Sequence, residues 1–285
     1  MKYAILGDLH GCILNLKRIK NKLKQCQTIF ITGDITGTIS YSLIIKSIFE
    51  TKRISRERYT ELVYSKYLDK FTSFQIKTAK KIFKILTKLN KPIFFTHGNS
   101  DTVVVREYFE KISKENSNLF YVGNSLKIYK DMTVIGYGFC SPAEYRTPFQ
   151  TPGEKEKEEI RTDLAKLEQI FYDDPSRNSN AVIGLFHEPP FDTELDFVHG
   201  KSDHGGSSII KKHILKIPFN FVFTGHIHES QGYDKIKSTL IINPGALVDR
   251  NYAILNTEKT EVYFFKLSIP LSFKELIYRT RTVFE

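Results

Sequence analysis

The chain has 285 residues, hydrophobic and charged fractions of 41% and 26%, and a formal net charge of +10. This length supports one large domain with a buried core, and we expect a single domain over residues 1–285. No apolar stretch approaches the ~20 residues of a membrane-spanning helix, and the first apolar run is too short for a secretory signal, so we expect a cytoplasmic protein without a membrane partner.

Short runs rich in Ile, Val and Phe recur along the chain and are typical of strands buried on both faces. They lie at residues 3–6, 28–32, 92–96, 133–137, 181–186, 219–224, 239–243, 252–255 and 262–267. Apolar residues at helical spacing predict helices over 13–26 and 160–170. Strands and helices alternate early and strands dominate late, which predicts an α/β sandwich with an antiparallel C-terminal portion.

Residues 38–91 interrupt this alternation and are predicted to form a helical insertion. Ser55 is a plausible N-cap for one helix, and a second helix should end at residues 90–92. Between Tyr41 and Lys91, thirteen Lys or Arg stand against four Asp or Glu, so this segment carries +9 of the net charge. Nucleic acid or another anionic partner would explain the charge, but a solvated helical face is the preferred explanation.

Five motifs with Asp, Asn or His lie at or just after predicted strands. They are GDLHG (7–11), GDITG (33–37), GNSD (98–101), HEPP (187–190) and GHIHES (225–230). Open α/β sheets build their sites at strand ends. Asp8 and His10, like His226 and His228, are two residues apart and would project to the same side of an extended chain. We therefore expect these side chains to converge.

The predicted site has the ligand inventory of a dinuclear metal centre. It combines two carboxylates, four imidazoles and one amide oxygen, from Asp8, His10, Asp34, Asn99, His187, His226 and His228. Nitrogen and oxygen ligands suit Mn, Fe, Zn or Ni better than Ca, and the missing thiolates argue against a soft metal. The three cysteines are widely spaced, form no CxxC pair, and are predicted to be buried and reduced.

In order and wording, the motifs resemble the calcineurin-like metallophosphoesterase superfamily, whose pattern is DxH, GD, GNH(D/E), a lone His after a strand, and GHxH. The resemblance spans roughly residues 3 to 256 and is strongest to small archaeal and bacterial phosphodiesterase-type members. It implies a four-layered α/β/β/α sandwich of two mixed sheets flanked by helices. It also implies two divalent metal ions, with Mn as the first choice and Fe, Zn or Ni as alternatives. The implied ligands are Asp8, His10 and His228 for one ion, Asn99, His187 and His226 for the other, and Asp34 as the bridge.

Ser100 departs from this pattern, because the superfamily has a histidine there that helps protonate the leaving oxygen. A serine hydroxyl is no acid near neutral pH, and losing general acid catalysis costs about 10²–10⁴-fold. We therefore expect a phosphodiesterase in which a metal-bridging hydroxide attacks phosphorus, with Asp34, Asn99 and His226 as catalytic residues. Ser100 is also a candidate contact for the substrate.

The stretch 196–208 offers a replacement for the missing acid. His204 is the candidate surrogate, with His199 as another choice, although the preferred explanation is that Asp203 and Ser207 only cap the following helix. The backbone N–H groups of Gly205 and Gly206 are candidate phosphate contacts at the same helix start.

Other functions stay open at this point. The protein could be a phosphomonoesterase acting on nucleotides or phosphoproteins, or a non-catalytic interaction scaffold, although a scaffold has no need of seven intact ligands. A nuclease is a weaker alternative suggested by the basic insertion. A phosphate-ester substrate is expected for each enzyme, nucleic acid is not favoured as a partner, and a homo-oligomer stays open.

Overall fold

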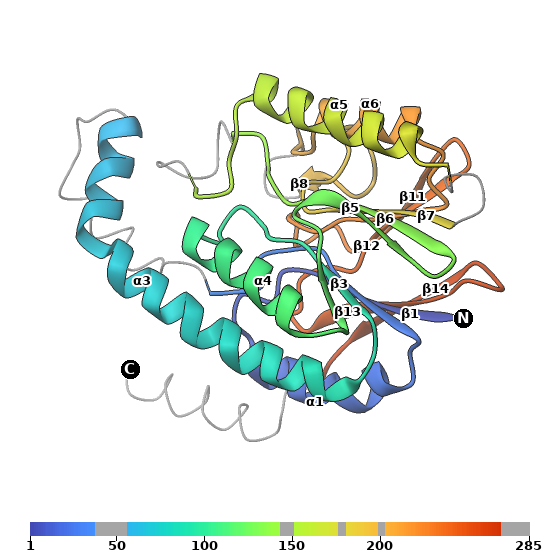
Figure 1. Ribbon diagram of the computed structural model, residues 1–285, viewed down its shortest axis with the longest axis horizontal. Helices are drawn as coiled ribbons and strands as arrows, with labels where there is room; N and C mark the ends of the chain where they lie inside the picture. Colours follow the sequence, from blue (N-terminus) through green and yellow to red (C-terminus); the bar gives the residue numbers. More distant parts are fainter. Residues whose placement is uncertain (38–55, 143–150, 176–180, 199–202, 269–285) are drawn as a thin grey trace, which may run out of the picture.

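Two six-stranded sheets pack face to face with helices on their outer faces, in a computed structural model of the chain (Figure 1). The structure describes residues 1–37, 56–142, 151–175, 181–198 and 203–268, without the side chains of residues 56–68. The strand orders are β14-β13-β1-β2-β3-β4 and β11-β12-β10-β7-β6-β5. Both sheets combine parallel and antiparallel pairs, so the predicted four-layered α/β/β/α class is confirmed.

The first sheet has a parallel half that aims three strand ends at one edge. Strands β1 to β4 run parallel, and β13 returns antiparallel to β1. Helices cover the outer face of this sheet (Figure 1). The elements are β1 (Lys2–Leu6), α1 (Ile13–Lys24), β2 (Thr28–Ile31), α3 (Arg56–Leu86), β3 (Ile93–Phe95), α4 (Val103–Glu115), β4 (Leu119–Tyr121), β13 (Asn251–Asn256) and β14 (Glu261–Lys266).

The second sheet repeats this arrangement. Strands β6, β7, β10 and β12 run parallel, and β5 and β11 pair antiparallel at the two edges. The elements are β5 (Asn124–Tyr129), β6 (Met132–Tyr137), α5 (Lys157–Asp173), β7 (Ala181–Phe186), α6 (Ser208–Lys216), β10 (Phe221–Phe223), β11 (Gly232–Ile236) and β12 (Thr239–Asn243). A separate ribbon pairs β8 (Phe197–Val198) with β9 (Asp203–His204).

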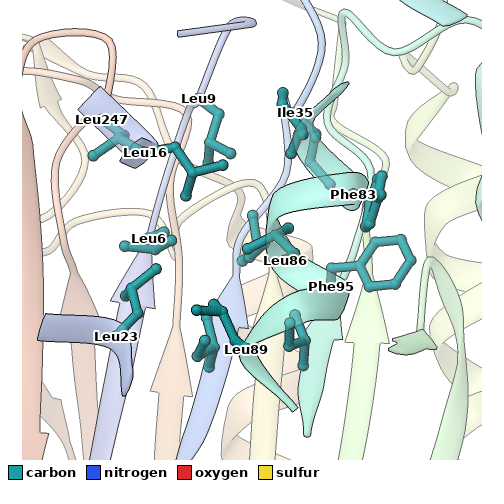
Figure 2. Packing of buried hydrophobic residues seen from close by; sticks show 14 of the residues in the cluster. Leu6, Leu9, Leu16, Leu23, Ile35, Phe83, Leu86, Leu89, Phe95 and Leu247 are labelled. Carbon is teal, nitrogen blue, oxygen red and sulfur yellow. The ribbon is translucent and has the colours of Figure 1, made fainter. Parts of the chain in front are cut away.

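Three buried clusters hold the layers together. One lies between the sheets and joins Phe30 and Phe94 to Phe223. Another lies under the helices of the first sheet, where Leu6, Leu16 and Leu86 belong to one cluster (Figure 2). The third fills the space beneath α5 and α6. Each fully buried Leu or Phe side chain contributes about 1.5–3 kcal/mol relative to exposure, so the strands that carry the motifs are firmly placed.

The described part of the basic segment forms one long helix. The prediction of two helices was wrong: α3 runs without a break, since no Gly or Pro interrupts residues 56–86. A 3-10 turn, Thr87–Leu89, then ends at Asn90 with a left-handed φ of 51°. Ile82 and Phe83 are buried in the core, so this half of the helix belongs to the fold. Residues 38–55, with the predicted cap Ser55, lie outside the described residues.

All nine predicted strands occur within two residues of their expected ends. Helix α4 and the strands β4, β5, β8, β9 and β11 were not predicted, because several of these elements alternate polar and apolar residues or are very short. Within the described residues, no helix has the length and apolar composition needed to cross a bilayer.

Candidate metal centre

The five motifs lie at the carboxyl ends of parallel strands from both sheets. Asp8 follows β1, Asp34 follows β2 and Asn99 follows β3. His187 follows β7 and His226 follows β10. Because the two sheets face each other, the two groups of strand ends meet at one place.

Left-handed turns aim several of these side chains at each other. Asp8, His10, Asp34 and His226 have φ of 45°, 41°, 44° and 69°. The expectation that Asp8 and His10 share a side of an extended chain was therefore wrong, although both still face the same site. Such non-glycine conformations cost about 1–3 kcal/mol each and persist only where the surrounding structure enforces them, which is common at functional sites.

Two glycines allow the turns to approach closely. A Cβ atom at Gly98 would lie 2.1 Å from Asp34 Oδ1, and one at Gly33 would lie 2.6 Å from His187 Nδ1. Any side chain at either position would push these groups apart.

Asp8, His10 and His228 form a first group of donor atoms. The Nε2 atoms of His10 and His228 are 3.1 Å apart, and His228 Nε2 is 3.5 Å from Asp8 Oδ1. The buried His10 Nδ1 has no hydrogen-bond partner among the described residues. Three donor side chains thus converge on one place.

Asn99, His187 and His226 form a second group. Asn99 Oδ1 lies 3.1 Å from His187 Nε2 and 3.1 Å from His226 Nδ1. His187 Nδ1 is 2.8 Å from the Thr32 carbonyl, which can only accept, so this nitrogen carries the proton. In the neutral ring, Nε2 and the Asn99 oxygen are then two acceptors facing each other.

Asp34 stands between the two groups. Its Oδ2 is 3.6 Å from His10 Nε2 and its Oδ1 is 3.7 Å from His187 Nε2. The Ser100 N–H donates to Oδ1 at 2.9 Å and keeps the carboxylate in this orientation. One carboxylate therefore faces both sets of donors.

The charges in the site depend on one another. Burial alone would raise the pKa values of Asp8 and Asp34, but the neighbouring imidazoles outweigh it and hold both pKa values below their usual range. Burial opposes a charge on His228, yet the Asp8 and Asp34 carboxylates raise its pKa to about 9. A proton on His228 thus balances the buried carboxylates, and a divalent cation would take over that role and release the proton.

This donor set fits divalent metal ions. Facing acceptors at Asn99 and His187 and two ionised buried carboxylates all become favourable around cations. The outer partners also fit, because Thr32 orients His187 and the Asp249 carboxylate lies 3.4 Å from His228 Nδ1.

Residues 1–230 match the family described as calcineurin-like phosphoesterase. The chain belongs to this family. Its members are metal-dependent hydrolases of phosphoric esters that hold divalent metal ions in a dinuclear site.

Individual proteins are similar to this chain in sequence or in fold. The uncharacterised protein MJ1162 of Methanocaldococcus jannaschii is 32% identical over 168 residues, or 58% of this chain and 67% of that protein. One solved crystal structure has a TM-score of 0.73 at 16% identity and covers 94% of this chain and 99% of its own. The protein TT1561 of Thermus thermophilus has a TM-score of 0.60 at 13% identity, and the match covers 93% of this chain and 98% of that protein. At these identities the two structures support the fold alone.

Asp101, the last residue of the GNSD motif in this calcineurin-like chain, links two motif loops. Its buried carboxylate accepts from Gly98 N at 3.1 Å, Ile35 N at 3.2 Å, Thr36 N at 3.0 Å and Thr36 Oγ1 at 2.6 Å. Gln75 of α3 adds a second tie, donating to the Ser100 carbonyl at 2.8 Å. The GNSD turn (98–101) is thus held against the loop that carries Asp34. The sequence offered no signal for Gln75, because this residue lies in the middle of a helix.

A thiol also lies beside the candidate site, where only nitrogen and oxygen donors were expected. The Sγ of buried Cys140 and one nitrogen each of His187 and His226 all lie within 4.8 Å of one another. Burial and the carboxylates of Glu188 and Asp34 raise the pKa of this thiol. All three cysteines are free; Cys26 is buried as predicted, but Cys12 is only half-buried.

The candidate surrogate acid and phosphate contacts lie around Asp196. His204 Nδ1 is 2.8 Å from Asp196 Oδ1, which raises the pKa of His204, and His204 belongs to none of the donor groups found among the described residues. The N–H groups of Gly205 and Gly206 already donate to Asp196, so neither is available to a phosphate here. Ser207 caps α6 as predicted, and His199 lies outside the described residues.

Proposed function

We propose that this protein is a dinuclear metal-dependent phosphoesterase that hydrolyses phosphodiesters. The supporting observation is the Asp34 carboxylate, which faces the group around His10 on one side and the group around His187 on the other. A carboxylate between two donor sets is the arrangement that a bridging ligand requires.

Seven residues would hold the two ions. Asp8, His10 and His228 would bind one, Asn99, His187 and His226 the other, and Asp34 both. The nitrogen and oxygen donors favour Mn²⁺, with Fe, Zn or Ni as alternatives. When bound, two such ions lower the pKa of water to the physiological range and offset the negative charge of the phosphate.

The chain itself keeps Asn99 and His226 aimed at the site. Asn99 Nδ2 donates to Thr151 Oγ1 at 3.1 Å, and Thr151 donates to Glu154 at 2.8 Å, so the amide oxygen faces the histidines. The His226 N–H lies 3.0 Å from Asp8 Oδ2, which joins the β10 turn to the β1 turn. Pre-orientation of this kind lowers the cost of reaching the transition state.

Ser100 supports the preference for diesters. Its side chain is buried, and its hydroxyl is no acid near neutral pH. With no acid at this position, substrates whose leaving group departs as a stable anion are favoured. His204, with its raised pKa and its bond to Asp196, is the proposed proton donor for poorer leaving groups.

Metal analysis combined with a paired assay tests this function. We expect about two divalent metal ions per chain and, with Mn²⁺ supplied, faster hydrolysis of a bis-aryl phosphate than of the mono-aryl phosphate with the same leaving group, both measured as kcat/KM. Less than one metal per chain together with activity on neither substrate would sink the enzyme proposal. A clear preference for the monoester would instead make the protein a phosphomonoesterase.

Replacing Ser100 by His should restore an acid beside the site. We expect about 10²-fold faster hydrolysis of substrates with poor leaving groups and little change for good ones, because only poor leaving groups need the proton. The slope of log kcat/KM against leaving-group pKa measures the effect. Ser100→Ala is the matched control without an acid, and an unchanged slope in correctly folded Ser100→His would show that protonation is not limiting or comes from elsewhere.

A further inference from the structure

Cys140 is held rigidly beside the second group of donors. It follows β6, and its N–H donates to the Gly153 carbonyl at 3.0 Å. Its carbonyl accepts from the Lys155 N–H, also at 3.0 Å. Only 1% of the residue is exposed. The backbone contacts on both sides leave the thiol with a fixed place in the interior.

The surroundings of the thiol contain ligand atoms and no competing partner. Its Sγ lies within 4.8 Å of one nitrogen of His187 and one of His226, and no hydrogen bond from Sγ occurs within the described residues. Those two histidines also face Asn99 Oδ1 at 3.1 Å each. The sulfur thus lies beside the same two histidine rings that face the Asn99 oxygen.

The distances agree with a shared ion after small adjustments of the side chains. In a tetrahedral site, metal bonds of ~2.3 Å to sulfur and ~2.0 Å to nitrogen hold these donors about 3.5 Å apart. The sulfur and the two nitrogens lie within 4.8 Å of one another, so they would move closer together around an ion. The facing acceptors at Asn99 and His187 call for a cation at the same place. The need for a cation thus follows from the contacts of Asn99 and His187, and the place of the thiol follows from its own distances to the two histidines.

We propose that Cys140 is a sulfur ligand of the metal ion held by Asn99, His187 and His226. The inference rests on the proposed dinuclear site and goes beyond it, because it makes the two ion positions chemically different. Binding exchanges the thiol proton for the ion: the S–H bond breaks, a sulfur–metal bond forms, and the proton leaves to solvent. Thiolate ligands favour Zn²⁺, Fe²⁺ or Co²⁺ over Mn²⁺ or Mg²⁺, so this position selects a softer ion than the position at Asp8, His10 and His228.

Cobalt titration of the metal-free full chain tests the assignment through a signal other than activity. A thiolate bound to Co²⁺ gives a charge-transfer band in the near ultraviolet, and we expect it to grow with one equivalent in the wild type. Cys140→Ser should lose the band and weaken Co²⁺ binding at one site by at least ~10-fold. Cys26→Ser removes another buried thiol and should keep both band and affinity.

The outcomes separate this inference from the proposed function. About two Co²⁺ bound without the band, or a band that survives in Cys140→Ser, overturns the sulfur ligand and leaves the dinuclear site standing. Failure to bind Co²⁺ at all overturns both. If Cys140→Ser does not fold, the double variant Cys12→Ser/Cys26→Ser leaves Cys140 as the sole cysteine and must retain the band.

Discussion

Replacement of Asp34 by Asn is expected to lower kcat/KM for the preferred diester by about 10²–10³-fold or more. The amide keeps the shape of the carboxylate but removes the charge that faces both His10 and His187. Without that charge, one carboxylate no longer serves both ions. Steady-state kinetics with saturating Mn²⁺ and metal content per chain measure the two effects.

The fold should survive this change. Asp34 and Asp8 are both ionised and buried, so removing one charge relieves repulsion in the metal-free protein. Asp173→Asn is the matched control, because Asp173 is exposed on α5 and, within the described residues, bonds only to Gln169. Near-wild-type turnover and two bound ions in folded Asp34→Asn would refute a bridging role.

Asp101→Ala is expected to reduce the free energy of unfolding by about 3 kcal/mol or more, because it leaves several buried donors unsatisfied. These donors are the N–H groups of Gly98, Ile35 and Thr36 and the Thr36 hydroxyl. Turnover should fall as well, since the Asp34 and Asn99 loops lose their common tie. Urea unfolding measures the stability, and kcat/KM measures the second effect.

Two further variants sharpen that result. Asp101→Asn keeps one acceptor oxygen and should lose less stability than Asp101→Ala. Asp173→Ala deletes an exposed carboxylate of the same size and should stay within ~0.5 kcal/mol of the wild type. A loss below ~1 kcal/mol in Asp101→Ala would mean that other contacts hold the two loops.

The fold followed closely from local patterns. Runs such as residues 181–186 are apolar on both faces, so burial requires a sheet that is covered on both sides. The motifs adjoin those runs, and the prediction that they meet depended only on parallel strands ending at one edge. Resemblance to the calcineurin-like family supplied the four layers, which periodicity alone did not.

Local geometry was harder to predict. Asp8 and His10 converge through left-handed turns and not through strand alternation, because contacts such as the His10 N–H to the Asp34 carbonyl at 2.8 Å bend the chain. Likewise, the apolar side of α3 packs in the core beside the first sheet over residues 76–86, which helps to keep the helix continuous. Short-range spacing carries no information about such partners.

The sequence by itself determined the class of fold and the set of Asp, Asn and His residues at the strand ends. Only the tertiary structure decided that Asp34 faces two donor groups, that Asp101 ties the loops, and that Cys140 stands beside His187 and His226. The physical reason is that these contacts join segments far apart in the chain, several of them from different sheets. Their distances depend on how the sheets pack, and a motif only a few residues long does not encode that packing.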